Sequence, residues 1–475
     1  MSNINNFSTA TGLSRAFVDG TLSPVEATKT ALAAIEEHDG TLNAFRLVDP
    51  DRALESARDS ESRWNAGTPV GPLDGVPISI KDMILAKGWP TLRGSRLINA
   101  DQPWLDDAPA VARLRSAGAV LLGKTNTAEF GWKGTTDSPL AGITCNPWDP
   151  TLTPGGSSGG AAAALASGMG ALALCTDGGG SVRNPASFNN LVGFKPTFGR
   201  VAAWPPNPIG TLANVCPMAR RVEDVALMMD ILVGPDRRDW LSLPADGIHY
   251  HAALTGEVKG LRIAYCPDLG FATVDPEVAA IVAQAARTFE QLGANVEEAE
   301  PGLGDTTPVF NTHWHVGVAN AFGGLPDDKL ALLDPGLDDF VRQGRVIALK
   351  DYVAAQNTRV ELGQKMRAFH ERYDILLLPT TAVPAFPADR RAPPGVGEDD
   401  WAAWTPFSYP FNLTLQPAIS VPGGFTKAGL PVGVQIVGGM YEDAKVLHAA
   451  YAFEQANPLY DRHPPLASSA RLGKS

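Results

Sequence analysis

The sequence TPGGSSGG occupies residues 153–160, and a second glycine-rich stretch, GGGS, occupies residues 178–181. Glycine has no Cβ and tolerates positive φ, so the backbone at such runs can come very close to another group. Ser157 and Ser181 each follow consecutive glycines, and each could present its hydroxyl beside free backbone N–H groups. A nucleophile beside an oxyanion hole is the arrangement that a serine hydrolase needs.

A serine hydroxyl is a weak nucleophile at neutral pH and needs a base. None of the eight histidines lies in either glycine-rich stretch. Lys81 ends the sequence VPISIK, residues 76–81, whose alternation predicts a short strand. Burial would lower the pKa of this lysine and make it a candidate base, although a lysine taken alone is more often an ordinary surface residue.

Several separated blocks of the chain, in the same order, resemble the amidase signature enzymes. The strongest part of the resemblance covers about residues 66–220. The blocks are GPLDGVPISIKDMILAKG (71–88), GAVLLGKTNTAEF (118–130), NPWDPTLTPGGSSGG (146–160), TDGGGSVRNPASFNNLVGFKPTFGRV (176–201), NLT (412–414), QPAISVP (416–422) and GLPVGVQ (429–435).

The resemblance implies that Ser181 is the nucleophile, that Lys81 is the base, and that Ser157, after a cis peptide bond, relays the proton between them. The implied oxyanion-hole donors are the backbone N–H groups of Gly178, Gly179, Gly180 and Ser181. Residues implied to support the site by hydrogen bonds are Ser158, Thr176, Asp177 and Arg183. The chain departs from the family at Gly178, where a bulky aliphatic residue is common, and this puts the shape of the oxyanion loop in doubt.

The function that the resemblance implies is hydrolysis of a C–N bond in a small linear amide through an acyl-enzyme on Ser181, with no cofactor and no metal. A second possibility within the family is the ammonia-releasing component of a glutamine-dependent amidotransferase, which works with partner subunits. A non-catalytic scaffold is disfavoured because Lys81, Ser157 and Ser181 are all present.

Other motifs favour different functions less well. The segment GGSSG, residues 155–159, formally matches the nucleophile elbow of an α/β-hydrolase esterase with Ser157 as nucleophile, but prolines rather than a strand precede it. Residues 118–125 formally match a phosphate-binding loop, but their apolar middle predicts a buried strand. His313 and His315 have no clear third metal ligand, so a packed wall is the better interpretation.

The bulk composition is typical of a cytoplasmic enzyme. A net charge of −12 gives no electrostatic support for nucleic-acid binding. The four cysteines have no metal-site spacing. The chain opens without a basic and apolar leader and has no apolar run long enough to span a membrane, so we expect no membrane association. The expected partner is a small amide substrate, and a homodimer is a reasonable prior.

We predict a single domain over residues 1–475. It would comprise N-terminal helices in 1–66, a catalytic core in 67–220, and the remaining sheet, pocket loops and a C-terminal helix in 221–475. The fold class implied by the resemblance is α/β, with a mixed, twisted central sheet covered by helices on both faces. Local patterns predict helices at 8–20, 23–38, 50–66, 161–174 and 275–292, strands at 76–81, 119–123, 261–266 and 295–300, and an exposed loop at 386–404.

The substrate is the part of the function that the sequence defines least. Phe130, Trp132 and His315 are candidate pocket residues. Four aromatic residues at positions 401, 404, 407 and 409 could equally line the pocket or pack in the core. An aromatic pocket would favour an aryl amide, an anilide or a carbamate of an aromatic amine. No arginine or lysine can be assigned from the sequence to bind a substrate carboxylate.

Overall fold

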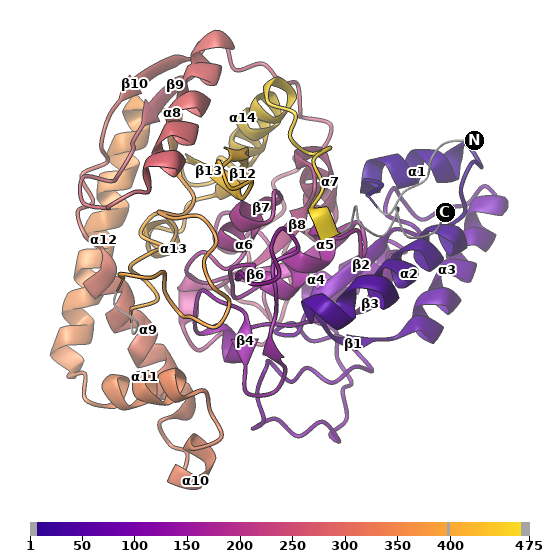
Figure 1. The fold of residues 1–475 in the computed structure, drawn as a ribbon, viewed down its shortest axis with the longest axis horizontal. Coiled ribbons are helices and arrows are strands. Elements are labelled where there is room, and N and C mark those ends of the chain that lie inside the picture. Colours follow the sequence, from indigo (N-terminus) through magenta and orange to yellow (C-terminus); the bar gives the residue numbers. More distant parts are fainter. Residues whose placement is uncertain (1–6, 397–399, 467–475) are drawn as a thin grey trace.

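The computed structural model describes residues 7–396 and 400–466, and an eleven-stranded sheet runs through this part of the chain (Figure 1). In spatial order its strands are β1 (Phe45–Val48), β3 (Val120–Thr125), β2 (Pro77–Lys81), β6 (Leu172–Asp177), β8 (Asn214–Ala219), β7 (Val192–Lys195), β12 (Ala418–Phe425), β13 (Pro431–Gly438), β11 (Ile375–Pro379), β9 (Arg262–Tyr265) and β10 (Asn295–Glu298). A separate short hairpin pairs β4 (Asp137–Ser138) with β5 (Gly142–Ile143).

The helices are α1 (Ala10–Val18), α2 (Pro24–Leu42), α3 (Pro50–Asn65), α4 (Pro109–Ser116), α5 (Gly159–Ala166), α6 (Arg183–Phe188), α7 (Val222–Leu232), α8 (Pro276–Gln291), α9 (Thr307–Phe322), α10 (Asp327–Leu330), α11 (Pro335–Arg345), α12 (Leu349–Arg372), α13 (Pro410–Leu413) and α14 (Asp443–Ala456). Two short 3₁₀ helices are η1 (Glu129–Gly131) and η2 (Gly210–Leu212). Within the described residues, no helix is both long and apolar enough to cross a membrane.

The sheet is mixed, which confirms the predicted fold class. Strand β2 is parallel to β3 and β6, and β9 is parallel to β10 and β11. Between these two parallel groups, the neighbouring pairs β6–β8, β8–β7, β7–β12, β12–β13 and β13–β11 are antiparallel, and so is the edge pair β1–β3.

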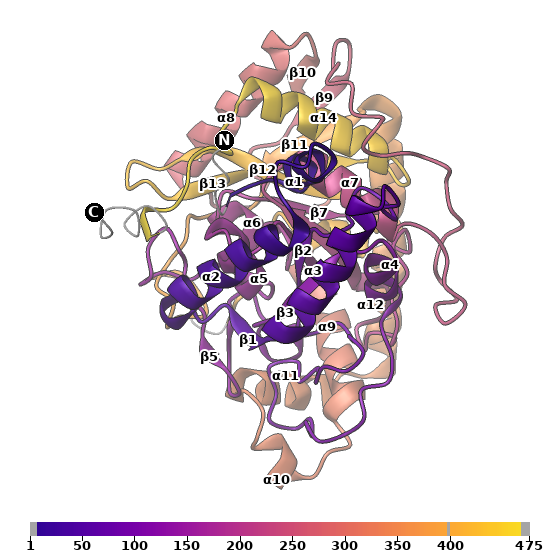
Figure 2. The ribbon, with the colours of Figure 1, turned by 90° about the vertical axis from the view of Figure 1, so that its right-hand side faces the viewer.

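Helices cover both faces of the sheet, as the alternation of side chains along β11 shows. Ile375 and Leu377 belong to an apolar cluster that includes residues of α7, α8 and α14. Leu376 and Leu378 belong to a different cluster with residues of α9, α11 and α12. Because successive side chains of a strand point to opposite faces, these two clusters lie on opposite sides of the sheet. In Figure 1, α9, α11 and α12 lie on the left and α1, α2 and α3 on the right, and Figure 2, seen from that right-hand side, shows α2 and α3 in front of the fainter α9 and α12.

Several local predictions are confirmed, because the signals for these elements are short-range. Helix α2 begins with the expected capping box, in which Glu26 N–H donates to Ser23 Oγ at 3.2 Å and Ser23 N–H donates to the Glu26 carboxylate at 2.8 Å. Helices α1, α3 and α8 and strands β2, β3, β9 and β10 fall within a few residues of their predicted ranges.

Two predictions are wrong. The alanine-rich run 161–174 is not one helix, because α5 ends at Ala166 and the chain then turns through Gly168 and Gly170, both with positive φ, into β6. The segment 386–404 has no helix or strand in its described part, as expected, but it is not generally exposed. Its aromatic side chains, including Trp401 and Trp404, are buried in apolar clusters.

The single-domain organisation stays a proposal, which the sheet supports. Hydrogen-bonded strands are contributed by residues from Phe45 to Gly438, and a cut at residue 66 or 220 would separate neighbouring strands of one sheet.

The start of α5 generates a stability prediction. A Cβ on Gly160 would lie 2.6 Å from three backbone atoms of Ala44 and Asn126, so we expect Gly160→Ala to lower the free energy of unfolding by about 1–3 kcal/mol. Gly40, exposed in α2 with no atom near its virtual Cβ, is the matched control, and Gly40→Ala should stabilise by about 0.5–1 kcal/mol. Urea unfolding of both variants measures this, and equal stability of the two would contradict the packing described.

Candidate active site

Lys81 is the last residue of β2 and its side chain has no exposed surface. The parallel pairing of β2 with β6 brings the carboxyl ends of both strands to one edge of the sheet, so Lys81 lies beside Thr176. Lys81 Nζ lies 2.8 Å from Ser157 Oγ, 2.8 Å from Ser158 Oγ and 2.9 Å from Thr176 Oγ1. The amine is therefore surrounded by three hydroxyl groups.

The two serines of the glycine-rich stretches meet at this point. Ser157 Oγ lies 3.0 Å from Ser181 Oγ, so Lys81, Ser157 and Ser181 form a continuous line of hydrogen bonds. The Gly156–Ser157 peptide bond is cis, as the sequence resemblance implied. Ser158 N–H donates to the Ser181 carbonyl at 3.2 Å, which ties the two stretches together. Ser181 is 8% exposed and is the most accessible of the three side chains in this line.

Burial lowers the pKa of Lys81 to about 8, and nearby negative charge, including that of Asp177, opposes this shift only in part. An ammonium loses its hydration when it is buried, so the neutral amine gains population at moderate pH. A lysine in this setting has the property that a general base requires.

The loop at residues 178–181 presents backbone donors beside Ser181. Of the four backbone N–H groups predicted for the oxyanion hole, that of Gly180 donates to Asp177 Oδ1 at 2.8 Å. Among the described residues, the N–H groups of Gly178, Gly179 and Ser181 donate to no protein acceptor.

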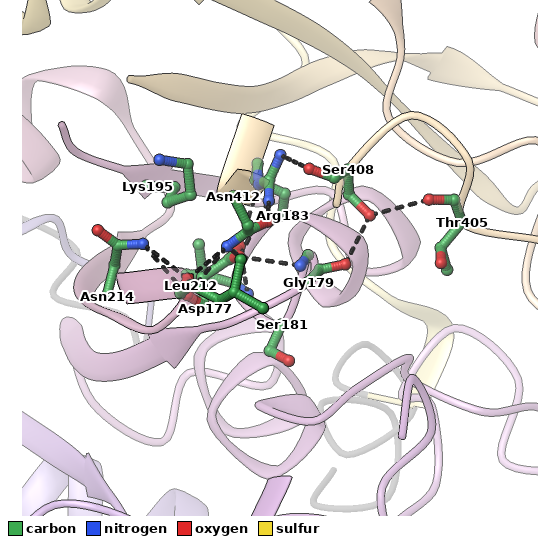
Figure 3. A network of polar contacts seen from close by, with 12 residues as sticks. Asp177, Gly179, Ser181, Arg183, Lys195, Leu212, Asn214, Thr405, Ser408 and Asn412 are labelled. Carbon is green, nitrogen blue, oxygen red and sulfur yellow. Dashed lines mark hydrogen bonds and ion pairs between the residues drawn. The ribbon is translucent and has the colours of Figure 1, made fainter. Parts of the chain in front are cut away.

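A buried ion pair holds this loop from behind. Arg183 Nε lies 3.0 Å from Asp177 Oδ2, its Nη2 lies 2.9 Å from Oδ1, and both side chains have no exposed surface (Figure 3). Burial alone would raise the pKa of Asp177, but the charge and hydrogen bonds of Arg183 hold it well below its usual value. The carboxylate therefore stays ionised and keeps its hold on Gly180.

The C-terminal third of the chain completes this network. Arg183 Nη1 donates to the Ser408 carbonyl and to Gln435 Oε1, both at 2.8 Å, and Nη2 donates to Asn412 Oδ1 at 2.7 Å. Ser408 Oγ donates to the Gly179 carbonyl at 2.8 Å, and Figure 3 shows Ser181 beside this group. None of these three partners of Arg183 was assigned a role from the sequence. Asn412 and Gln435 lie in blocks that carry the family resemblance, which was the available signal.

A cavity of about 460 Å³ opens above the serines. Ser157, Thr176, Gly178 and Ser181 are among its lining residues. Much of the remaining wall is apolar or aromatic and includes Met83, Ile84, Phe130, Trp132, Trp204, Pro205, Pro206, Pro208, Ile209, Trp240, Leu241, Trp314, Val318 and Phe322.

The structure places two of the three predicted pocket residues at the cavity and the third away from it. Phe130 and Trp132 line the cavity, whereas His315 does not and packs edge-on against Phe340 at 4.3 Å between ring centroids. His315 lies in helix α9, whose successive side chains point about 100° apart. Trp314, one residue earlier, and Val318, one turn later, therefore face the cavity in place of His315.

The wall explains why residue 178 is a glycine. A Cβ on Gly178 would lie 2.8 Å from Ile209 Cδ1 and 3.2 Å from two ring atoms of Trp314. These two side chains occupy the space that a larger residue at position 178 would need. The resembled family commonly has a bulky side chain at this position. In this chain, Ile209 and Trp314 of the cavity wall lie next to the glycine instead.

The four aromatic residues before the last strands belong to the core. Trp401, Trp404, Phe407 and Tyr409 are buried and none lines the cavity. Tyr409 stacks on Phe310 with ring centroids 4.7 Å apart, and its hydroxyl lies 2.7 Å from Thr307 Oγ1. The four aromatic side chains therefore pack in the core behind the cavity wall, and they do not line the pocket.

The structure does not support the alternative in which Ser157 is the nucleophile of an α/β-hydrolase elbow. An elbow needs a strand immediately before the serine, yet residues 144–156 form no strand. The side-chain partners of the Ser157 hydroxyl are Lys81 and Ser181.

Comparison with known proteins agrees with this geometry. The family model described as Amidase matches residues 26–447. An acylamidase of Rhodococcus erythropolis is 37% identical over 466 residues, covering 96% of each chain, and a glutamyl-tRNA(Gln) amidotransferase subunit of Myxococcus xanthus is 36% identical over 477 residues, covering 94% of this chain and 96% of the relative. The crystal structure of a bacterial aryl acylamidase of the amidase signature family superposes with a TM-score of 0.89 at 31% identity, covering 96% of this chain and 98% of that one.

The Asp177–Arg183 pair generates a stability prediction. Arg183→Met would leave the Asp177 carboxylate buried without its partner, and we expect the free energy of unfolding to fall by about 3–5 kcal/mol. The control is Arg342→Met, which breaks a surface pair with Asp338 and should change stability little. Urea unfolding compares the two, and similar stabilities would show that the buried pair does not hold the loop.

Proposed function

The chain belongs to the amidase signature family of hydrolases acting on C–N bonds, and we propose that it is a free-standing amidohydrolase that cleaves small acyl amides through an acyl-enzyme on Ser181. The observation that carries this proposal is the line of hydrogen bonds from Lys81 Nζ through Ser157 Oγ to Ser181 Oγ at the base of an apolar cavity.

The proposed reaction begins with neutral Lys81. A neutral amine has two N–H donors and one lone pair, which matches three hydroxyl neighbours if Ser158 and Thr176 accept and Ser157 donates. Ser158 fits the part of acceptor because its own hydroxyl donates to the Thr176 carbonyl at 3.2 Å. The lone pair of Lys81 then takes the proton of Ser157, and Ser157 takes that of Ser181.

Ser181 Oγ attacks the amide carbonyl, and the charge develops on the carbonyl oxygen. The N–H groups of Gly178, Gly179 and Ser181 are proposed to stabilise it, each contributing on the order of 3 kcal/mol as in comparable sites. The Asp177–Arg183 pair fixes the loop before the reaction, so these donors need little reorganisation.

The leaving amine must be protonated because an amide anion is a very poor leaving group. Ser157 lies between Ser181 and Lys81, and it passes the proton to the nitrogen as the C–N bond breaks. Water then attacks the acyl-enzyme through the same relay, which releases the acid and returns Lys81 to the neutral form.

The expected substrates are amides with an apolar or aromatic part, such as acyl anilides or aryl carbamates. The aromatic cavity wall supports this class, and so do the acylamidase and aryl acylamidase among the relatives. The relationship to amidotransferase subunits supports a second candidate, a component that releases ammonia from glutamine only with partner proteins.

Product release from a small panel tests the function: ammonia or an amine from the amides, the carbamate and glutamine, and a phenol from the ester. The panel contains an aliphatic amide, an anilide, an aryl carbamate, glutamine and an aryl ester, each assayed with wild-type protein and with Ser181→Ala. We expect release from the anilide or the carbamate that is abolished by Ser181→Ala and falls at least about 100-fold in Lys81→Met. Release that persists in Ser181→Ala would contradict the proposed nucleophile. If folded wild-type protein released no product from any of the five compounds, the partner-dependent amidotransferase component would be favoured.

The pKa of Lys81 generates a pH prediction. The neutral fraction of a base with a pKa of about 8 falls about tenfold for each pH unit below that value, so kcat/KM for a neutral anilide should rise about tenfold per unit from pH 6 to near pH 8 and then level off. Initial rates from pH 6 to pH 10 measure this profile. A rate that is flat or falls with rising pH over the same range would exclude neutral Lys81 as the base.

A further inference from the structure

Arg93 occupies a fixed position at the cavity. Its backbone N–H donates to the Asp82 carbonyl at 3.0 Å and its carbonyl accepts from Phe130 N–H at 2.8 Å. Its φ of 54° lies in the left-handed region, which few residues other than glycine adopt. Asp82 directly follows Lys81, and Arg93 lines the same cavity as Ser157 and Ser181.

The Arg93 side chain has no polar partner of its own within residues 7–396 and 400–466. Its guanidinium makes no hydrogen bond and lies within 4.0 Å of no carboxylate, and its Nε is buried. A guanidinium offers five N–H donors, and buried polar groups in proteins are normally hydrogen-bonded. An arginine in this state at a substrate cavity is available to bind an acceptor on the substrate.

The other arginine at the cavity provides the contrast. Arg238 Nε and Nη2 each lie 3.0 Å from a carboxylate oxygen of Asp236, and Nη1 donates to the Asp107 carbonyl at 3.1 Å. Its guanidinium also lies over the Trp204 ring, 4.8 Å from the centroid. Arg238 therefore has its partners within the protein.

The surroundings of Arg93 leave its charge uncompensated. The carboxylate whose charge acts on the Arg93 guanidinium is Asp82, which lies 2.9 Å from Arg46 Nε and 3.6 Å from Lys124 Nζ. Three cationic side chains thus share one carboxylate. The cavity also contains Asp239, whose two oxygens accept the backbone N–H groups of Ala203 and Leu241. The side chains gathered around Asp82 thus carry an excess of positive charge, in a chain whose net charge is −12.

We propose that Arg93 binds a carboxylate on the substrate, so that the preferred amides combine an apolar or aromatic body with an anionic group. This inference rests on the proposed amidase function and names its substrate class. A guanidinium matches a carboxylate with two parallel hydrogen bonds, and such charge-assisted pairs are stronger than neutral ones. The aromatic wall would hold the body of the substrate while Arg93 sets its orientation relative to Ser181.

Matched pairs of substrates test this proposal in turnover. One pair differs on the acyl side, the 4-nitroanilides of butanoic acid and of butanedioic acid, and one on the amine side, acetanilide and 4-acetamidobenzoate. In at least one pair we expect kcat/KM to be about tenfold or more higher for the carboxylate, mainly through KM. Arg93→Met should remove this preference, Arg93→Lys should keep part of it, and Arg238→Met should retain it.

A binding measurement keeps the test independent of catalysis. Calorimetry with the Ser181→Ala protein should show tighter binding of the preferred carboxylate than of its neutral partner, and the added Arg93→Met change should abolish that difference. Thermal melting of each variant verifies that it is folded. If binding depends on Arg93 but wild-type protein does not turn over any substrate, the site stands and the amidase proposal fails. If neither pair shows a carboxylate preference, or the preference survives in folded Arg93→Met, the proposal is wrong.

Discussion

A lysine amine with no exposed surface, held between three hydroxyl groups, is the constraint on which the rest of this structure depends. Removing an ammonium from water without a carboxylate partner is costly, and the pKa of Lys81 falls to about 8 as a result. The fold must therefore bring the lysine and its neutral partners together from three different segments. Strand β2 provides the lysine, β6 provides Thr176, and the loop before α5 provides the two serines. Parallel pairing of β2 with β6 makes the meeting possible because it aligns their carboxyl ends.

The second requirement is a loop whose backbone donors stay in place beside Ser181. A buried carboxylate at Asp177 orders this loop through Gly180 and Val182, and Arg183 keeps that carboxylate ionised. The partners of Arg183 lie more than 220 residues further along the chain, in α13, β13 and the segment before them. The C-terminal strands thus help to hold the loop at residues 178–181, and the family model likewise spans residues 26–447.

The sequence predicted the features that depend on short-range signals. The capping box of α2, the end of β2 at Lys81 and the placement of Ser157 beside Ser181 all follow from local patterns or from motifs. It did not predict features that depend on tertiary contacts. The phase of α9 decides that Trp314, and not His315, faces the cavity. The hydrogen bond from Gly180 N–H to Asp177 depends on the orientation of the Asp177 carboxylate. The role proposed for Arg93 depends on the lack of a hydrogen-bond partner for its side chain. Neither can be derived from residue types alone.

The central claim is that Ser181 becomes acylated with the help of Lys81 and Ser157, and trapping the covalent intermediate tests it most directly. Wild-type protein would be mixed with a 4-nitrophenyl N-alkyl carbamate, quenched, and analysed by intact mass and peptide mapping, because a carbamoyl-enzyme hydrolyses more slowly than an ordinary acyl-enzyme. We expect one carbamoyl group per chain on Ser181, absent in Ser181→Ala and formed far more slowly in Lys81→Met. A carbamoyl group on Ser157, or equal labelling of Ser181→Ala, would contradict it.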